Sequence, residues 1–155
     1  LSAQAVNSAE ATAGDAGLLR AQILLDGARF SPGEIDAGAG SNTRGAIAAY
    51  QRAHDLESSG ELDAATWKSL NAGAPDVLVR YTVTAADAAG PYATLPDDIM
   101  EKAGLDALGY ASALEMLAEK FHASPKLLQR LNPDAAFDKA NVDGVANPRN
   151  PGRGT

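Results

Sequence analysis

The spacing of apolar residues changes once along the chain, at Ala74-Pro75-Asp76. Before this point apolar residues recur with the period of amphipathic helices, and residues 77–84 then alternate as they would on a strand. The change predicts two structural units. Because 33 residues are alanine and aromatic residues make up only 5% of the chain, each residue offers little apolar surface. Two small cores, one in each unit, are therefore expected.

The first unit is predicted to contain three short helices. The first has Asp15 as its N-cap and ends at Gly27, the second starts with Ser41 or Asn42 as its cap and runs through His54, and the third covers residues 64–71 with Asp63 as its cap. In the second helix, Arg44, Gln51 and Arg52 are expected to face outward. The glycine-rich residues 26–42 are expected to form a long loop.

The second unit is predicted to be α+β. After the strand at residues 77–84, a short helix is expected from Asp97 to Ala103. Ser112-Ala113-Leu114-Glu115 has the form of a capping box that opens another helix. Ser124 followed by Pro125 predicts the start of a last helix, which runs to Leu131.

The two ends of the chain have small, polar and aperiodic sequences. Residues 1–15 are predicted to be a flexible segment, and residues 149–155 a tail. Ala3-Gln4-Ala5 has the form of the end of a secretory signal peptide, although an alanine-rich chain also produces this pattern by chance. Between the ends, the predicted domains are residues 16–73 and 77–148.

The net charge excludes several classes of partner. With 13 Lys and Arg against 20 Asp and Glu, the chain carries a formal charge of −7. A chain of this charge without a basic run is not expected to bind nucleic acid or an anionic membrane surface. The sequence also lacks an apolar run of the roughly 18 residues that a membrane span requires.

The residues offer little support for catalysis. Cysteine is absent, which excludes thiolate nucleophiles and cysteine-based metal sites. His54 and His122 have no second ligand at metal-binding spacing, and Gly38 to Asn42 match neither a phosphate loop nor a nucleophile elbow. The sequence therefore predicts no metal, no cofactor and no enzymatic activity in this chain, and elimination favours binding.

Residues 18–70 resemble the type 1 peptidoglycan-binding domain, a three-helix module of bacterial cell-wall enzymes. The resemblance rests on the leucines of the first helix, the loop Ile35 to Thr43, Ala46 to Gln51, Gly60-Glu61-Leu62-Asp63, and Thr66-Trp67 with Leu70. The family usually has Asp-Gly and then an aromatic-Gly pair in the loop, whereas this chain has Ala37 and Ala39 in those places.

The resemblance implies a ligand surface beside the loop. Asn42, Arg44 and Gln51 offer hydrogen bonds to sugar hydroxyls, acetamido groups or the carboxylates of stem peptides. Asp36 and Thr43 suit loop pinning and helix capping, and Tyr50 and Trp67 suit packing between helices. The predicted ligand-binding residues are Asp36, Asn42, Thr43, Arg44, Tyr50 and Gln51.

Residues 81–133 are similar to LysM, a small α+β module that binds N-acetylglucosamine chains, with a long insertion through Ala85 to Tyr110. The similarity rests on Tyr81-Thr82-Val83, on Ser112 to Pro125, and on Leu127, Leu128, Leu131, Asn132 and Pro133. The expected fold is thus mainly α: a three-helix peptidoglycan-binding-type bundle followed by a small α+β LysM-like module.

The two modules in this order resemble the region ahead of the catalytic domain in bacterial L,D-transpeptidases. The resemblance implies a non-catalytic peptidoglycan-binding protein, or the targeting region of such an enzyme, that is exported to the periplasm or cell envelope. A cell-wall enzyme domain is then an expected partner. The alternative is a helical scaffold module that docks a cell-wall enzyme without itself binding glycan.

Overall fold

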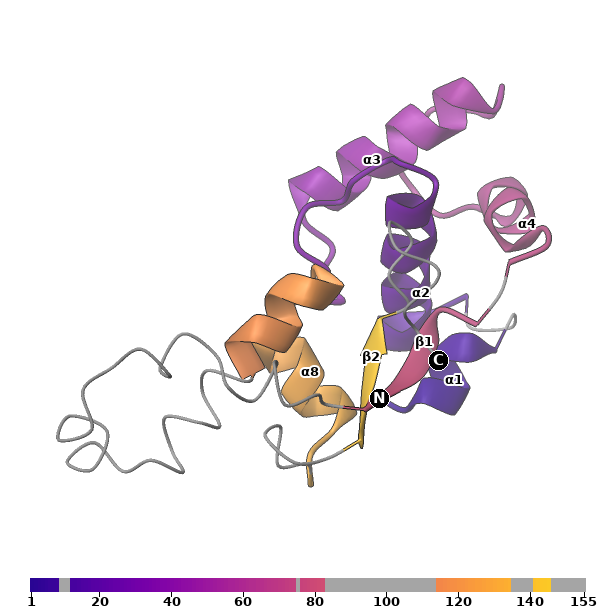
Figure 1. The fold of residues 1–155 in the computed structure, drawn as a ribbon. Coiled ribbons are helices and arrows are strands. Elements are labelled where there is room, and N and C mark those ends of the chain that lie inside the picture. The colour runs from indigo at the N-terminus through magenta and orange to yellow at the C-terminus, as the bar shows by residue number, and fades with distance from the viewer. Residues whose placement is uncertain (9–11, 75, 83–113, 135–140, 146–155) are drawn as a thin grey trace, which may run out of the picture.

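The computed structural model describes residues 1–8, 12–74, 76–82, 114–134 and 141–145. The described chain is mainly helical, which confirms the predicted fold class at this level, and it contains one antiparallel pair of strands. The elements are α1 (Ala3–Asn7), α2 (Gly14–Gly27), α3 (Ser41–Ala53), α4 (Ala64–Asn71), β1 (Leu78–Thr82), α8 (Pro125–Leu131) and β2 (Asn141–Val145), with a further helical segment at residues 114–121. Figure 1 shows α2 near the centre, with α3 across one end of it.

The N-terminal segment is folded where flexibility was predicted. Ser2 caps α1 by accepting a hydrogen bond from the Ala5 amide (3.2 Å), and Val6 is completely buried. The Asn7 side chain accepts hydrogen bonds from the amides of Val77 (2.9 Å) and Leu78 (2.8 Å). The prediction of a flexible segment is therefore wrong for residues 3–7, because their partners lie some seventy residues further along the chain, where no local pattern reveals them.

Of the three helix starts predicted in the first unit, one agrees with the structure. Asp63 caps α4, since its carboxylate accepts a 2.8 Å hydrogen bond from the Thr66 amide. Asp15 was predicted as the cap of α2 but lies inside its first turn, and Ala13 occupies the cap position. Gly40, rather than Ser41 or Asn42, precedes α3, and no side chain caps that helix. Both wrong predictions assumed that the nearest polar residue ends the loop.

The described residues of the second half form the strand pair and two helical segments. β1 and β2 run antiparallel, with Leu78 opposite Val145 and Thr82 opposite Asn141. A Cβ atom added to Gly144 would lie 2.5 Å from the Phe121 ring, so glycine is needed for this close approach. Ser124 caps α8 through the Leu127 amide (3.1 Å), with proline at the first helical position, as predicted.

Several sequence predictions fall outside the described residues. These are the helix at Asp97–Ala103, the first two residues of the capping box, the insertion through Ala85 to Tyr110 and the tail at 149–155.

The apolar residues form two clusters, but the clusters do not follow the predicted division of the chain. The larger one joins Leu19 and Ile23 of α2 and Ile35 of the following loop to residues of β1, the helical segment 114–121 and α8. The smaller one joins α2 to α3 and α4 through Leu25, Ala46, Ile47, Tyr50 and Leu70. The prediction of one core for each unit is wrong, because different faces of α2 pack into different clusters.

Polar contacts also join the two halves. The Ile35 amide donates to the His122 carbonyl and the Ser124 amide donates to the Ile35 carbonyl, both at 2.9 Å, so that Ile35 and Ala123 form a parallel β-bridge. Arg130 and Asp15 form an exposed ion pair at 2.7 Å. The loop after α2 is therefore held in place by the second half of the chain.

Arg20 is a buried cation that anchors the N-terminal segment. It is 2% exposed, donates to the carbonyls of Val6 and Asn7 at 3.2 Å, and reaches the side-chain oxygen of Asn71 at 2.9 Å. Burial lowers the pKa of Arg20 from its ordinary value, and the charge of Asp76 partly opposes this shift. Arg20 thus ties α1 and the end of α4 to α2.

Candidate functional site

The predicted ligand loop is organised by a residue that was not among the predicted site residues. Gln22 of α2 is completely buried, and its side-chain oxygen accepts hydrogen bonds from the amides of Asp36 (3.2 Å) and Ala37 (2.8 Å). Its side-chain nitrogen lies within hydrogen-bonding distance of Asp36 Oδ1 (3.1 Å), the Gly38 carbonyl (3.0 Å) and Thr43 Oγ1 (3.1 Å). The signal in the sequence was Gln22 itself, a polar residue among the apolar residues of the helix that became α2.

Asp36 and Thr43 pin the loop, as predicted, but the predicted helix capping is wrong, since no side chain caps α3. Asp36 accepts a 2.7 Å hydrogen bond from the Gly38 amide, and the buried Thr43 hydroxyl donates to the Gly38 carbonyl at 3.3 Å. The hydroxyl of Thr43 is thus engaged inside the protein. Asp36 is nevertheless exposed as a residue.

Ala37 has a backbone conformation that glycine normally adopts. Its φ is +61°, and it stands where the resembled family usually has glycine. For a residue with a Cβ atom this left-handed conformation costs roughly 1 kcal/mol. The Gln22 network holds it there, since the Ala37 amide makes the shortest of the hydrogen bonds to the Gln22 side-chain oxygen.

Gln51 was predicted to face outward, and this is wrong. It is completely buried, and its side-chain nitrogen donates to the Glu61 carbonyl and to Thr66 Oγ1, both at 2.9 Å. Its side-chain oxygen accepts from the Gly60 amide at 2.9 Å. The prediction assumed that a polar residue on a helix faces solvent, whereas Gln51 has its hydrogen-bond partners in the loop after α3 and at the start of α4.

Tyr50 packs between elements, as predicted. Only 4% of it is exposed, its hydroxyl lies 2.6 Å from Ser69 Oγ, and its ring meets Phe30 edge-on and stacks on His54. Trp67 is likewise buried. Ligand contacts by Tyr50 and Gln51 stay predictions, and both side chains have internal partners.

Asn42 and Arg44 are the predicted site residues whose side chains lie at the surface near the start of α3. No side chain caps this helix, so its first amide groups have no side-chain acceptor. Helix N-termini and arginine favour anionic groups, and asparagine both donates and accepts hydrogen bonds. We refer to Asp36, Asn42 and Arg44 as the loop edge. Its Arg44 and Asn42 side chains are of the types that pair with carboxylate and acetamido groups.

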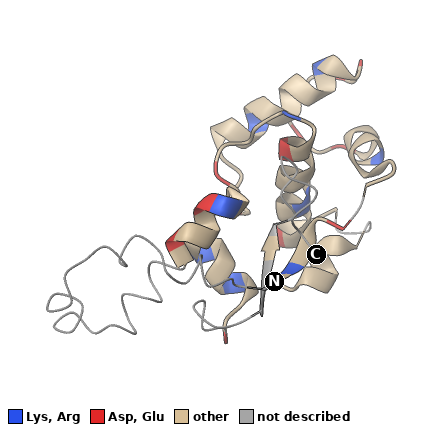
Figure 2. Cartoon of the chain, in the orientation of Figure 1, with Lys and Arg blue, Asp and Glu red and all other residues tan. Residues whose placement is uncertain are grey.

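The described residues carry charged side chains of both signs. Figure 2 shows Lys and Arg on several helices, interspersed with Asp and Glu. The described residues contain no cluster of three or more His, Asp or Glu side chains that could hold a metal ion. The hydrogen bonds from Thr66, its hydroxyl first and then its amide, lower the pKa of Asp63 from its ordinary value of 3.8.

Comparison with known families gives one match. Residues 15–70 match the family model described as "Putative peptidoglycan binding domain". The match covers α3, all but one residue of α2 and of α4, and the two loops whose backbones bond the side chains of Gln22 and Gln51. A search of curated proteins found no match. Within the described part of the chain, no helix combines the length and the apolar character that crossing a membrane requires.

Proposed function

We propose that this protein is a non-catalytic peptidoglycan-binding protein of the bacterial cell envelope. The observation that carries the proposal is the family match over residues 15–70, which includes every residue of the loop edge. The geometry supports it, since Gln22 fixes the loop from inside and leaves Asn42 and Arg44 exposed. A fixed loop with exposed polar side chains loses little conformational entropy when it binds a ligand.

The chemistry of the loop edge suits carboxylates and amides more than a bare sugar ring. Arg44 and the amides at the start of α3 favour carboxylate groups, which stem peptides supply. Peptides of this wall polymer also carry many amide groups, which Asn42 can pair with. An acidic chain that binds an anionic polymer must rely on such local hydrogen bonds, because its net charge of −7 opposes long-range attraction.

We propose further that the second half is a LysM-like module, and that the whole chain is the targeting region of an L,D-transpeptidase-like enzyme, exported to the periplasm or cell envelope. In support, the described residues between β1 and β2 include two helical segments, 114–121 and α8, and the strands pair antiparallel. A pair of antiparallel strands with helices between them along the chain is a feature expected of such a module. A cell-wall enzyme domain is the partner that this proposal implies.

Co-sedimentation with insoluble peptidoglycan tests the proposal. The chain is expected to pellet with the polymer, and N42A/R44A is expected to weaken binding by about 3- to 10-fold, the loss of one or two exposed polar contacts. The matched control is R52A, which removes the same charge from the opposite end of α3, where Arg52 donates to Ser58.

Two outcomes contradict the proposal. A chain that stays wholly in the supernatant at several salt concentrations rejects peptidoglycan binding. If that chain forms a complex with a wall enzyme, the scaffold function replaces it. Equal losses in N42A/R44A and R52A would reject the loop edge as the binding surface, while leaving binding by another face.

A further inference from the structure

The turn after the helical segment 114–121 has a histidine at a position where helices usually have glycine. The Ala123 amide donates to the Ala118 carbonyl (2.9 Å) and the His122 amide to the Glu119 carbonyl (3.2 Å), which are the two hydrogen bonds of a Schellman C-cap. His122 occupies the left-handed position of this motif, with a φ of +55°. A residue with a Cβ atom adopts this conformation at an energetic cost, and it persists where other contacts offset that cost.

The side chain of His122 makes such a contact with the end of α2. Its Nδ1 lies 3.9 Å from Oδ2 of Asp26, and the two side chains are 39% and 3% exposed. Asp26 belongs to the last turn of α2, where the helix dipole is also negative. Because water screens a buried carboxylate less than an exposed one, the attraction at this distance is stronger than it would be at the surface. A protonated imidazole at His122 is therefore attracted to this end of α2.

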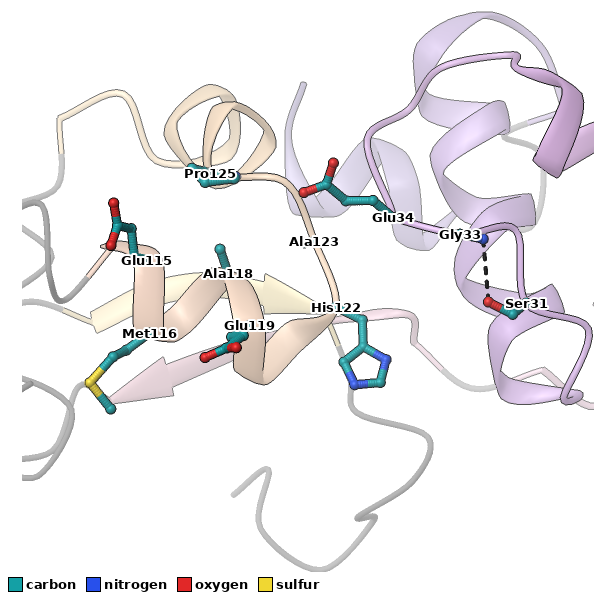
Figure 3. Close-up of a pocket in the computed structure, with 10 residues that line it drawn as sticks. All are labelled: Ser31, Gly33, Glu34, Glu115, Met116, Ala118, Glu119, His122, Ala123 and Pro125. Atoms are coloured by element: carbon teal, nitrogen blue, oxygen red, sulfur yellow. Dashed lines mark hydrogen bonds between the residues drawn. The ribbon is translucent and has the colours of Figure 1, made fainter. Parts of the chain in front are cut away.

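The other charged groups that share a pocket with His122 are acidic. This open pocket is also lined by Glu34 of the loop after α2, and by Glu115 and Glu119 of the helical segment (Figure 3). Among the described residues, those that line it include no lysine or arginine. Lys120 of the same segment donates to the hydroxyl of a tyrosine in β1 (2.5 Å). The loop thus adds to the attraction from α2, whereas the two glutamates of the segment belong to the same side as the histidine.

His122 is also part of the contact that joins the two halves of the chain. Its carbonyl accepts the Ile35 amide, and the Ser124 amide donates to the Ile35 carbonyl, both at 2.9 Å. Ala123, between these two residues, is 3% exposed and packs with Ile35 in the larger apolar cluster. Because the imidazole ring and the bonded carbonyl belong to one residue, a force on the ring acts directly on the Ile35–Ala123 bridge.

We propose that His122 is a pH-sensitive latch between the two halves. Its protonated ring, attracted by Asp26, holds the turn against α2 and the following loop, and the neutral ring releases this attraction. Imidazole is the side chain whose ordinary range of charge change lies between about pH 5 and 8. The attraction is thus present on the acidic side of this range and is lost as the pH rises. The latch acts on the docking of the two halves and does not depend on peptidoglycan binding.

Hydrogen exchange of the full chain tests the latch, followed by NMR at the Ile35 and Ser124 amides between pH 5.5 and 7.5. After correction for the intrinsic pH dependence of exchange, both amides are expected to be protected about 2- to 5-fold more at the lower pH, the effect of a partly exposed ion pair. H122N should abolish this difference, because asparagine tolerates the left-handed conformation and carries no charge. D26N should reduce it, because the ring then has no carboxylate on α2 to attract it.

H54N is the matched control. His54 is the other histidine of the chain, and its ring stacks on Tyr50, which belongs to the smaller apolar cluster. H54N should therefore keep the pH dependence at the two bridge amides. This result, together with its loss in H122N and its reduction in D26N, supports the latch. Equal protection of the unsubstituted chain at both pH values, or a pH dependence that persists in H122N, overturns it, whether or not the chain pellets with peptidoglycan. If D26N does not fold, the comparison of H122N with H54N decides.

Discussion

Two buried glutamines fix two loops of this protein, and the loops differ in what they connect. Gln22 holds the loop from Asp36 to Thr43, and Gln51 holds the loop that contains Gly60 and Glu61. In both, the side-chain oxygen accepts from backbone amides and the side-chain nitrogen donates to loop oxygens. The same chemistry therefore recurs on two successive helices.

The difference lies at the ends of the loops. The Gln22 loop continues from Ile35, which bridges to Ala123 in the second half, and it carries Asp36 and Asn42 of the loop edge. The Gln51 loop is closed by Asp63, which caps α4 within the first half. The comparison indicates that one glutamine supports the whole molecule and the proposed site, whereas the other supports a local bundle.

The largest expected effect is that of Q22A. The substitution leaves the amides of Asp36 and Ala37 without their acceptor, at a cost of about 3–4 kcal/mol in the free energy of unfolding. Urea titration measures this loss, and hydrogen exchange at the Ile35 and Ser124 amides should rise because the bridge loosens. Q129A, at an exposed position of α8, serves as the control. If the Ile35 and Ser124 amides of Q22A exchange as slowly as in the unsubstituted chain, Gln22 does not support the Ile35–Ala123 bridge.

Q51A is expected to cost less, about 2–3 kcal/mol, because fewer backbone amides lose their acceptor. Its effect should stay local: the Gly60 amide exchanges faster and Trp67, the one tryptophan, changes its fluorescence. After correction for the loss of global stability, the Ile35 amide of Q51A should exchange as slowly as in the unsubstituted chain. If Q51A instead opens Ile35 as much as Q22A does, the two loops are not independent.

The pair G60A and A37G tests the backbone of each loop. Gly60 has a φ of +75°, and an added Cβ would lie 3.3 Å from the Arg44 carbonyl, so G60A should destabilise by about 1–2 kcal/mol. A37G should stabilise by less than about 1 kcal/mol, because relief of the left-handed strain exceeds the loss of one buried methyl group. Thermal unfolding measures both. A destabilised A37G would show that the Cβ of Ala37 matters more for packing than for strain.

The smallest expected effect concerns the charge of Asp63. Because its pKa is lowered in the folded state, Asp63 stabilises the fold at pH above its ordinary value of 3.8, and this contribution is lost as the pH falls below that value. D63N keeps a capping oxygen and removes the charge. The difference in thermal unfolding midpoint between the unsubstituted chain and D63N should therefore become smaller as the pH is lowered. Circular dichroism measures both midpoints. A constant difference would show that the charge does not contribute.

Local patterns predicted the parts of the fold that depend on neighbouring residues. The caps at Asp63 and Ser124 bond amides within three residues, and the strand at Leu78–Thr82 follows from its own alternation of residues, although its partner strand lies some sixty residues further along. The docking of α1 and the cluster shared by both halves depend on partners far along the chain. A single sequence does not specify these partners.

The candidate site was predicted in part, for the same reason. Asp36 and Thr43 were assigned to loop pinning because short polar residues in a glycine-rich loop suit that role, and both pin the loop. Gln51 was placed on the wrong side of its helix, because its partners belong to a loop whose path no local pattern describes. Glu34 and the helical segment that carries Glu115 and Glu119 line one open pocket beside the Ile35–Ala123 bridge, which no local pattern predicts (Figure 3).

The Ile35–Ala123 bridge also has a consequence for the order of events during synthesis. A ribosome must add nearly ninety residues after Ile35 before its partner exists, so the larger core cannot close while the first half is emerging. Until then Leu19 and Ile23 lack the partners that the second half supplies, and only the smaller cluster of α2, α3 and α4 can form early. The nascent chain thus passes through a long stage in which half of α2 is packed and the other half is exposed to water.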